Sequence, residues 1–210
     1  MNFTLPSLYA IIDAQRLEGR SAAAMAEAWL KAGVRLIQYR DKVNASRDIY
    51  DACLQLSSLI HQAQAAFIVN DRTDIALAVE ADGVHLGQDD FPVEEARRIL
   101  GNNKIVGYST HDLGQLAAAD RAPVDYVAFG PVFPTQSRQN PSPVVGLAGL
   151  AAARAATRKP LVAIGGITAE NAAGVLQAGA DSVAVIQALH EGAEAGEAAR
   201  RLLDSLRRPE

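Results

Sequence analysis

The chain has 210 residues, 49% hydrophobic and 21% charged, with a formal net charge of −4. This composition is ordinary for a globular protein, and it argues against a basic nucleic-acid-binding surface. No apolar stretch reaches the ~18 residues of a membrane-spanning helix, and the first residues lack the basic and apolar regions of a signal peptide. A single cysteine, Cys53, rules out an intrachain disulfide, so we expect a cytoplasmic location.

Short apolar runs alternate with longer amphipathic segments along the whole chain. Most of the runs lack alternation of apolar and polar residues, which is typical of strands buried on both faces of a parallel sheet. The predicted strands are 8–12, 35–39, 66–70, 83–86, 104–109, 125–130, 160–165 and 182–186. The predicted helices are 20–32, 46–64, 73–80, 93–100, 112–119, 147–157, 169–178 and 194–207.

Eight β/α units in unbroken order, with no linker between them, predict one (β/α)8 TIM barrel of parallel strands over 1–210. A doubly wound open sheet is the alternative, but the glycine-rich dinucleotide fingerprint is missing after the first strand. The longest irregular segment, 131–146, has the length of a binding loop or lid.

Polar side chains gather where the predicted strands end, which is where barrel enzymes carry their active sites. They are Gln38, Arg40, Lys42, Asn70, Asp71, His85, Gln88, Asp89, Asp90, Ser109, His111, Thr135, Ser137, Arg138, Gly165 and Gly166. Their shared position is stronger evidence for a site than any one of them.

Asp71 and Asp90 lie one β/α step apart, at the ends of neighbouring strands. Because such strands are about 4.8 Å apart, both carboxylates can reach one ion. Two carboxylates without a Cys or His cluster suit a hard cation such as Mg²⁺, completed by phosphate oxygens and water. The alternative is that each caps the helix that follows. Asp89 is the less suitable ligand.

Gln38, Arg40 and Lys42 alternate along one extended segment, so they face the same side. They form a cationic wall suited to a diphosphate, unless they are simply solvated charges at a loop end. Gly166 precedes a helix after the seventh strand, where backbone N–H groups bind phosphate; a plain turn glycine is the alternative.

The histidines are less specific. His85 lies between apolar residues and is either a core residue or part of the site. His111 is placed for acid–base chemistry or for capping the next helix. His61 and His190 are expected on helix surfaces.

Several segments, in order, resemble the thiamine phosphate synthase family from about Tyr9 to Leu206. They are GVRLIQYRDK, VNDRTDIALAVEADGVHLGQDD, GYSTHD, DYVAFGPVFPT and VAIGGITAENAAGVLQAGADSVAVI. The resemblance implies a transferase that joins 4-amino-5-hydroxymethyl-2-methylpyrimidine diphosphate to hydroxyethyl-methylthiazole phosphate. Small-molecule substrates and Mg²⁺ would then be its partners, and a homo-oligomer stays open.

The resemblance also implies residue roles. The pyrimidine diphosphate would be held by Gln38, Arg40, Lys42, Asn70, Ser109 and Arg138, of which Arg40, Lys42, Ser109 and Arg138 would be catalytic. The thiazole phosphate would be surrounded by Thr135, Ser137, Gly166, Ile186 and Gln187. Asp71 and Asp90 would bind Mg²⁺.

The chain departs from the family's usual pattern at Arg138, where lysine is common, and at Gln187, where serine is common. Two alternative functions stay open. One is a tautomerase of the thiazole phosphate, which works through a histidine without a metal. The other is a non-catalytic barrel that binds thiazole or thiamine phosphates. Neither alternative needs the pair Asp71 and Asp90.

Overall fold

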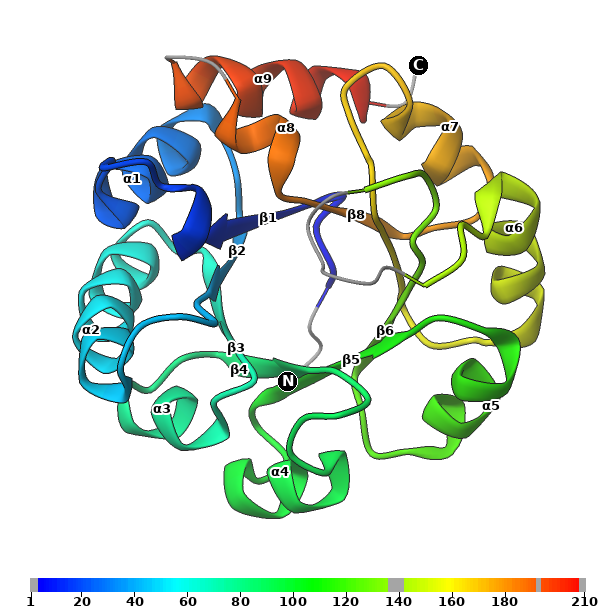
Figure 1. Ribbon diagram of the computed structural model, residues 1–210, viewed down its shortest axis with the longest axis horizontal. Helices are drawn as coiled ribbons and strands as arrows, with labels where there is room; N and C mark the ends of the chain where they lie inside the picture. Colours follow the sequence, from blue (N-terminus) through cyan, green and yellow to red (C-terminus); the bar gives the residue numbers. More distant parts are fainter. Residues whose placement is uncertain (1–3, 136–141, 192–193, 208–210) are drawn as a thin grey trace.

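Eight parallel strands close into a barrel surrounded by helices (Figure 1). The computed structural model describes residues 4–135, 142–191 and 194–207. The strands are β1 (Leu8–Asp13), β2 (Leu36–Arg40), β3 (Ala66–Asn70), β4 (Gly83–Leu86), β5 (Ile105–Thr110), β6 (Tyr126–Phe129), β7 (Leu161–Ile164) and β8 (Ser182–Val185). They pair in chain order, and β1 closes on β8 with Leu8 opposite Val183. The predicted TIM barrel is confirmed, and the open sheet is wrong.

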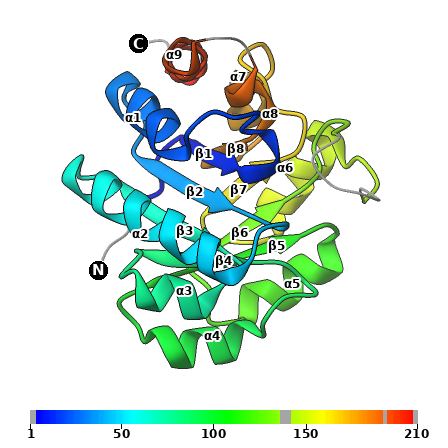
Figure 2. The same cartoon turned by 60° about the vertical axis from the view of Figure 1, so that its left-hand side comes forward.

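The helices follow the strands along the chain. They are α1 (Ala22–Ala32), α2 (Ser46–Gln62), α3 (Thr73–Ala78), α4 (Val93–Leu100), α5 (Leu113–Arg121), α6 (Gly146–Ala156), α7 (Ala172–Gln177), α8 (Gln187–His190) and α9 (Ala195–Ser205), with a 3-10 turn η1 (Ala14–Arg16) after β1. Figure 2 shows α9 beside α1, which brings the last helix against the first. The two short elements η1 and α8 were not predicted from the sequence.

Local chemistry sets several of these boundaries. Ser21 caps α1 by accepting a hydrogen bond from the Ala24 N–H, and Gly33 ends it with a φ of 110°. The helix predicted over 169–178 begins later than expected, because residues 169–171 form a turn. The Asn171 side chain closes that turn by accepting from the Thr168 N–H at 2.9 Å, so α7 begins at Ala172.

The strands bury residues on both faces, as the continuous apolar runs predict. Between strands and helices lies the larger core, which includes Trp29, Leu56 and Phe67. Inside the barrel lies a smaller one, made of Tyr9, Ile11, Leu36, Ile68, Ile105, Tyr126, Ala128, Val162 and Ala184. This inner layer is the floor on which the polar residues of one barrel mouth stand. In the described part of the chain, no helix is both long and apolar enough to cross a membrane.

Candidate active site

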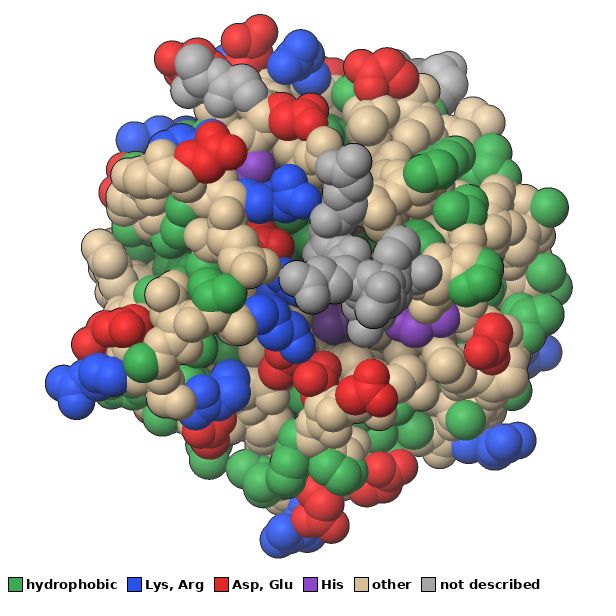
Figure 3. Space-filling view, viewed as in Figure 1, with side chains coloured by type: hydrophobic (Ala, Val, Ile, Leu, Met, Phe, Trp, Pro, Cys, Tyr) green, Lys and Arg blue, Asp and Glu red, His purple; other side chains and the backbone are tan. Residues whose placement is uncertain are grey.

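A cavity of about 340 Å³ opens at the C-terminal ends of the strands. Its floor includes the inner-core residues Ile11, Ala128, Val162 and Ala184. Figure 3 shows this mouth face-on, with basic, acidic and histidine side chains gathered around its middle. The predicted site residues that line the cavity are Gln38, Arg40, Lys42, Asn70, Asp71, Asp90, Ser109, Thr135, Gly166, Ile186 and Gln187. Ser137 and Arg138 lie outside the described residues.

Asp71, Asp90 and Lys42 form one charged cluster. The Lys42 ammonium pairs with Asp71, and its Nζ lies 3.5 Å from Asp90 Oδ1. Burial, with the neighbouring Asp90 carboxylate, raises the pKa of Asp71 to about 6 despite Lys42. Burial also acts to raise the pKa of Asp90, but hydrogen bonds from Asp71 and the Gly87 N–H hold it below its usual value. The two carboxylates are therefore close enough to compete for one cation.

Neither carboxylate caps the helix that follows it, so the capping alternative is wrong for both. The N-cap residue of α3 is Arg72 and that of α4 is Pro92, and neither helix shows a side-chain cap. Asp90 instead accepts a 2.7 Å hydrogen bond from the Gly87 N–H, which fixes its carboxylate beside the cavity. Asp71 has a φ of 62°, an unusual conformation for a residue other than glycine.

The carboxylate pair suits a hard divalent cation. Lys42 already places a positive charge between the two groups, and their oxygens are the donors such an ion takes. Among the described residues, no cluster of three or more His, Cys, Asp or Glu could hold a metal. A cation held here would therefore take its other ligands from water or from a substrate's phosphate oxygens. Asp89 is exposed and does not line the cavity.

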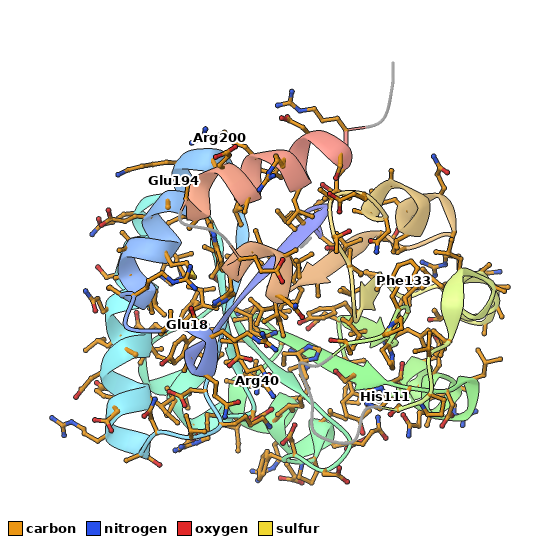
Figure 4. All side chains as sticks on the ribbon, turned by 45° about the horizontal axis from the view of Figure 1, so that its top comes forward. Glu18, Arg40, His111, Phe133, Glu194 and Arg200 are labelled. Carbon is orange, nitrogen blue, oxygen red and sulfur yellow. The ribbon has the colours of Figure 1, made fainter. Side chains whose placement is uncertain are left out.

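Arg40 is positioned by a residue that the sequence analysis did not single out. Its Nη1 donates to Asp13 Oδ2 at 2.8 Å, and the Asp13 side chain is only 2% exposed. Figure 4 shows Arg40 toward the middle of the barrel, whereas Glu194 and Arg200 lie at the outer helix α9. Asp13 ends β1, so the rule that collected polar residues at strand ends would have found it. This ion pair holds the Arg40 guanidinium in a fixed orientation at the cavity.

Asn70 carries an unsatisfied donor. The residue is 9% exposed and lines the cavity, and its Nδ2 has no hydrogen-bond partner among the described residues. Burying an amide without a partner is costly, so this arrangement favours a ligand that accepts the hydrogen bond.

The loop after β7 approaches the loop after β6 at two glycines. Gly165 and Gly166 have φ values of 93° and 64°, and a Cβ on Gly166 would lie 2.5 Å from the Pro134 carbonyl oxygen. The Phe133 N–H donates to the Gly165 carbonyl at 3.1 Å. The close backbone approach therefore requires glycine at this position, as a turn glycine alone would explain, and its role in binding phosphate stays a prediction. The same loop presents Thr168 and Ile167 to the cavity.

The family model described as thiamine monophosphate synthase matches residues 8–189. The chain belongs to this family. A thiamine-phosphate synthase of Chloroflexus aurantiacus is 45% identical over 93% of this chain and 90% of that protein. One of Koribacter versatilis is 48% identical over 87% and 88%. The solved thiamine phosphate pyrophosphorylase of Pyrococcus furiosus superposes with a TM-score of 0.86 at 36% identity, covering 95% of both chains.

Gln187, one of the departures from the pattern of the synthase family, faces an acidic neighbour. Its Nε2 donates to Glu191 Oε1 at 2.8 Å across the short helix α8. Both residues line the cavity, and Glu191 was not predicted as part of it. One N–H of the Gln187 amide is therefore occupied by the Glu191 carboxylate.

One histidine expectation, for His190, needs correction, and the alternatives for His111 and His85 are narrowed. His190 is buried, and its Nε2 accepts from the Asp13 N–H at 3.2 Å, so it is not a surface residue. His111 does not cap α5, because the Asp112 side chain does so; its Nδ1 lies 2.7 Å from the Gly130 carbonyl at the cavity wall. His85 is both a buried residue and part of the cavity lining.

Proposed function

We infer that this chain is a thiamine-phosphate synthase. It joins 4-amino-5-hydroxymethyl-2-methylpyrimidine diphosphate to hydroxyethyl-methylthiazole phosphate and releases diphosphate. We further propose that residues 1–210 form one barrel domain. The observation that carries the reaction is the meeting of two cations, two carboxylates and a partnerless amide over an apolar floor.

In the proposed reaction, the bond between the pyrimidine methylene carbon and the diphosphate oxygen breaks first. The electron pair leaves with diphosphate, and the ring's amino group stabilises the resulting cation. The thiazole nitrogen then attacks the methylene carbon and forms the new C–N bond. No nucleophile from the protein is needed, so catalysis is electrostatic stabilisation and positioning.

The residues divide this work between two sides of the cavity. Arg40 and Lys42 balance charge that develops on the diphosphate, and Arg40 is already oriented by Asp13. Asn70 and Gln38 hold the first substrate, and Ser109 contacts its ring. For the second substrate, we propose that Thr135, Ser137, Gly166, Ile186 and Gln187 surround the phosphate, with backbone N–H groups as donors.

Asp71 and Asp90 would hold the Mg²⁺ that we propose as the metal. When bound, this ion would add positive charge beside the leaving group. Lys42 pairs with the same carboxylates, so a cation held there would compete with its ammonium, which would then be available to the diphosphate.

The alternative functions are not favoured. A tautomerase or a binding barrel has no use for an acidic pair joined to the cationic wall, and the relatives from Chloroflexus aurantiacus and Koribacter versatilis are named as synthases. The cytoplasmic location expected from the sequence stays a prediction.

The direct test mixes both substrates with Mg²⁺ and follows thiamine phosphate and diphosphate by mass spectrometry and a phosphate assay. We expect both products in equal amounts, and neither when one substrate is left out. Conversion of the thiazole phosphate alone would instead support the tautomerase. Binding of the substrates without any product would support the non-catalytic barrel.

A further inference from the structure

Five side chains form a continuous hydrogen-bond chain through the inside of the barrel. Gln38 Nε2 donates to the Tyr9 hydroxyl at 2.7 Å, and the Tyr9 and Tyr126 hydroxyls are 2.9 Å apart. The Tyr126 hydroxyl lies 2.8 Å from His85 Nδ1, and His85 Nε2 lies 2.8 Å from Ser109 Oγ. The chain runs through β2, β1, β6, β4 and β5. Its two ends, Gln38 and Ser109, line the cavity, and so do Tyr9 and His85 between them.

The middle of this hydrogen-bond chain, which we call the relay, is buried and closely packed. Tyr9 is 1% exposed and Tyr126 is fully buried. The Tyr126 ring stacks on His85 with 5.6 Å between ring centroids and meets the Tyr9 ring edge-on. A Cβ at Gly107 would overlap the Tyr126 ring, so the glycine makes room for it. Hydrogen bonds in such an interior are strong and mutually polarised.

The relay has a defined direction. Burial raises the pKa values of Tyr9 and Tyr126 far above their usual range, so both are neutral phenols, each with one proton to donate. The His85 ring has one hydroxyl partner on each nitrogen, Tyr126 at Nδ1 and Ser109 at Nε2, and a neutral imidazole meets such a pair with one donor and one acceptor nitrogen. Because Tyr9 accepts from Gln38, its own proton points to Tyr126. The Tyr126 proton then points to His85 Nδ1, which leaves Nε2–H to donate to Ser109.

The two ends therefore have fixed roles. Gln38 donates one of its two amide N–H groups to Tyr9, which fixes the orientation of the amide and leaves its carbonyl oxygen available as an acceptor. Ser109 accepts from His85, which leaves its own proton to donate. A 4-aminopyrimidine presents an amino donor and a ring-nitrogen acceptor. A 4-oxopyrimidine reverses both, with a carbonyl acceptor and a ring N–H donor.

We propose that Tyr9, Tyr126 and His85 are positioning residues whose ordered protons make the site select a 4-aminopyrimidine over a 4-oxopyrimidine. The proposal rests on the proposed function for the identity of the first substrate. The three residues act through Gln38 and Ser109 and need not touch the reacting atoms. A 4-oxopyrimidine would place its ring N–H against the Ser109 hydroxyl proton and its carbonyl oxygen against that of Gln38. Such buried mismatches cost binding free energy, so selection by this route is strong.

The first test measures binding of the two pyrimidine diphosphates, 4-amino and 4-oxo, by calorimetry with Mg²⁺ and without the thiazole phosphate. In Tyr126→Phe, we expect the preference for the amino form to fall about fivefold or more, since His85 can then adopt either tautomer. Tyr9→Phe should lower the preference less, because it frees only the Gln38 amide. Tyr50→Phe, which removes a hydroxyl on α2 outside the cavity lining, is the matched control. An equal loss of affinity for both ligands in the two relay variants would overturn the proposal.

The second test reads the relay directly. The chain has four histidines, so ¹⁵N-labelled histidine gives a spectrum in which His85 can be assigned by substitution. We expect the Nε2–H tautomer at His85 in the unchanged protein and a mixture in Tyr126→Phe. The opposite tautomer in the unchanged protein would show that Ser109 donates toward His85, and the proposal would be wrong. This experiment needs no substrate, so its result stands if a Tyr variant binds poorly.

The outcomes for the relay and for the proposed function are separable. If no thiamine phosphate forms from the correct substrates, the proposed function fails, whatever the tautomer of His85. If product forms and the amino preference is the same in Tyr126→Phe and Tyr50→Phe, the proposed function holds and the relay does not set selectivity.

Discussion

The two sides of the cavity are built on different principles. On the side of β2 to β4, charged side chains are fixed by one another: Asp13 holds Arg40, and Lys42 joins Asp71 to Asp90. On the side of β6 to β8, the lining is mainly backbone, glycine and uncharged side chains, with Glu191 as a carboxylate among them. The difference fits a reaction in which one substrate loses a charged leaving group and the other only has to be placed.

The contrast implies different responses to substitution. Loss of a charge on the first side, that of β2 to β4, should lower the rate of the chemical step, because charge develops there. Loss of a contact on the second side, that of β6 to β8, should raise the KM for the thiazole phosphate, because those contacts are made equally before and during the reaction.

The largest effect is expected from Asp71→Asn. Removing one of the two carboxylates weakens the metal site, and we expect turnover to fall about a hundredfold or more, since a metal contributes several kcal/mol to charge stabilisation. Excess EDTA should abolish activity of the unchanged protein. Asp74→Asn, at an exposed residue paired with Arg72, is the control and should keep its activity. Normal turnover of Asp71→Asn, or activity that persists in EDTA, would refute a metal at this pair.

On the second side, Gly166→Ala tests the close approach of the two loops. The new Cβ would lie 2.5 Å from the Pro134 carbonyl oxygen and 2.7 Å from Phe133 Cβ, at a φ that disfavours alanine. We expect the KM for the thiazole phosphate to rise roughly tenfold or more, with the KM for the pyrimidine diphosphate nearly unchanged. Gly174→Ala is the control, because its Cβ would have 4.0 Å to Leu147 Cδ1. Equal rises in both KM values would place the glycine between the two substrates and weaken the division.

Arg138 decides how far the charged side extends. A guanidinium can bind two phosphate oxygens at once, so we expect it to replace the family's lysine at the diphosphate. Arg138→Ala should lower kcat/KM at least tenfold, which corresponds to about 1.4 kcal/mol. Arg138→Lys should restore most of the loss. Unchanged kinetics in the alanine variant would show that the residue points to solvent.

The fold could be predicted from the sequence because each element carries its own signal. The predicted bounds of β3 and β4 agree with the structure, because the first run ends at the polar Asn70 and the second lies between Asp82 and Gly87. The helix α8 was missed because four residues show no helical period. The start of α7 was predicted three residues too early, because helix propensity does not show that the Asn171 side chain closes a turn there.

The site was predictable only where one rule, polar residues at strand ends, sufficed. That rule collected Arg40 and Asp71, but it says nothing about which side chains meet. Tyr9 and Tyr126 are separated by 117 positions in the sequence, and each looks like an ordinary core aromatic. Their contact depends on the register of strands on opposite sides of the barrel and on the space left by Gly107. Such information exists only once the barrel is closed.

The smallest effect is expected from Glu191→Gln, which tests the one carboxylate that lines the second side among the described residues. Repulsion between unit charges roughly 8 Å apart in water is about 0.5 kcal/mol, so removing the charge should lower the KM for the thiazole phosphate about two- to threefold. The gain should fade at high salt, because screening removes the same repulsion. The KM for the pyrimidine diphosphate should not move.

The variant keeps the geometry that a structural role would need. A glutamine at 191 can still accept the hydrogen bond from Gln187 Nε2, so the α8 contact is preserved while the charge is lost. Glu197→Gln, on the exposed side of α9, controls for a general change in net charge. A rise in the KM for the thiazole phosphate would show that the carboxylate is needed to hold Gln187. The second side would then depend on a charged pair as well, and the contrast between the two halves of the cavity would be one of degree.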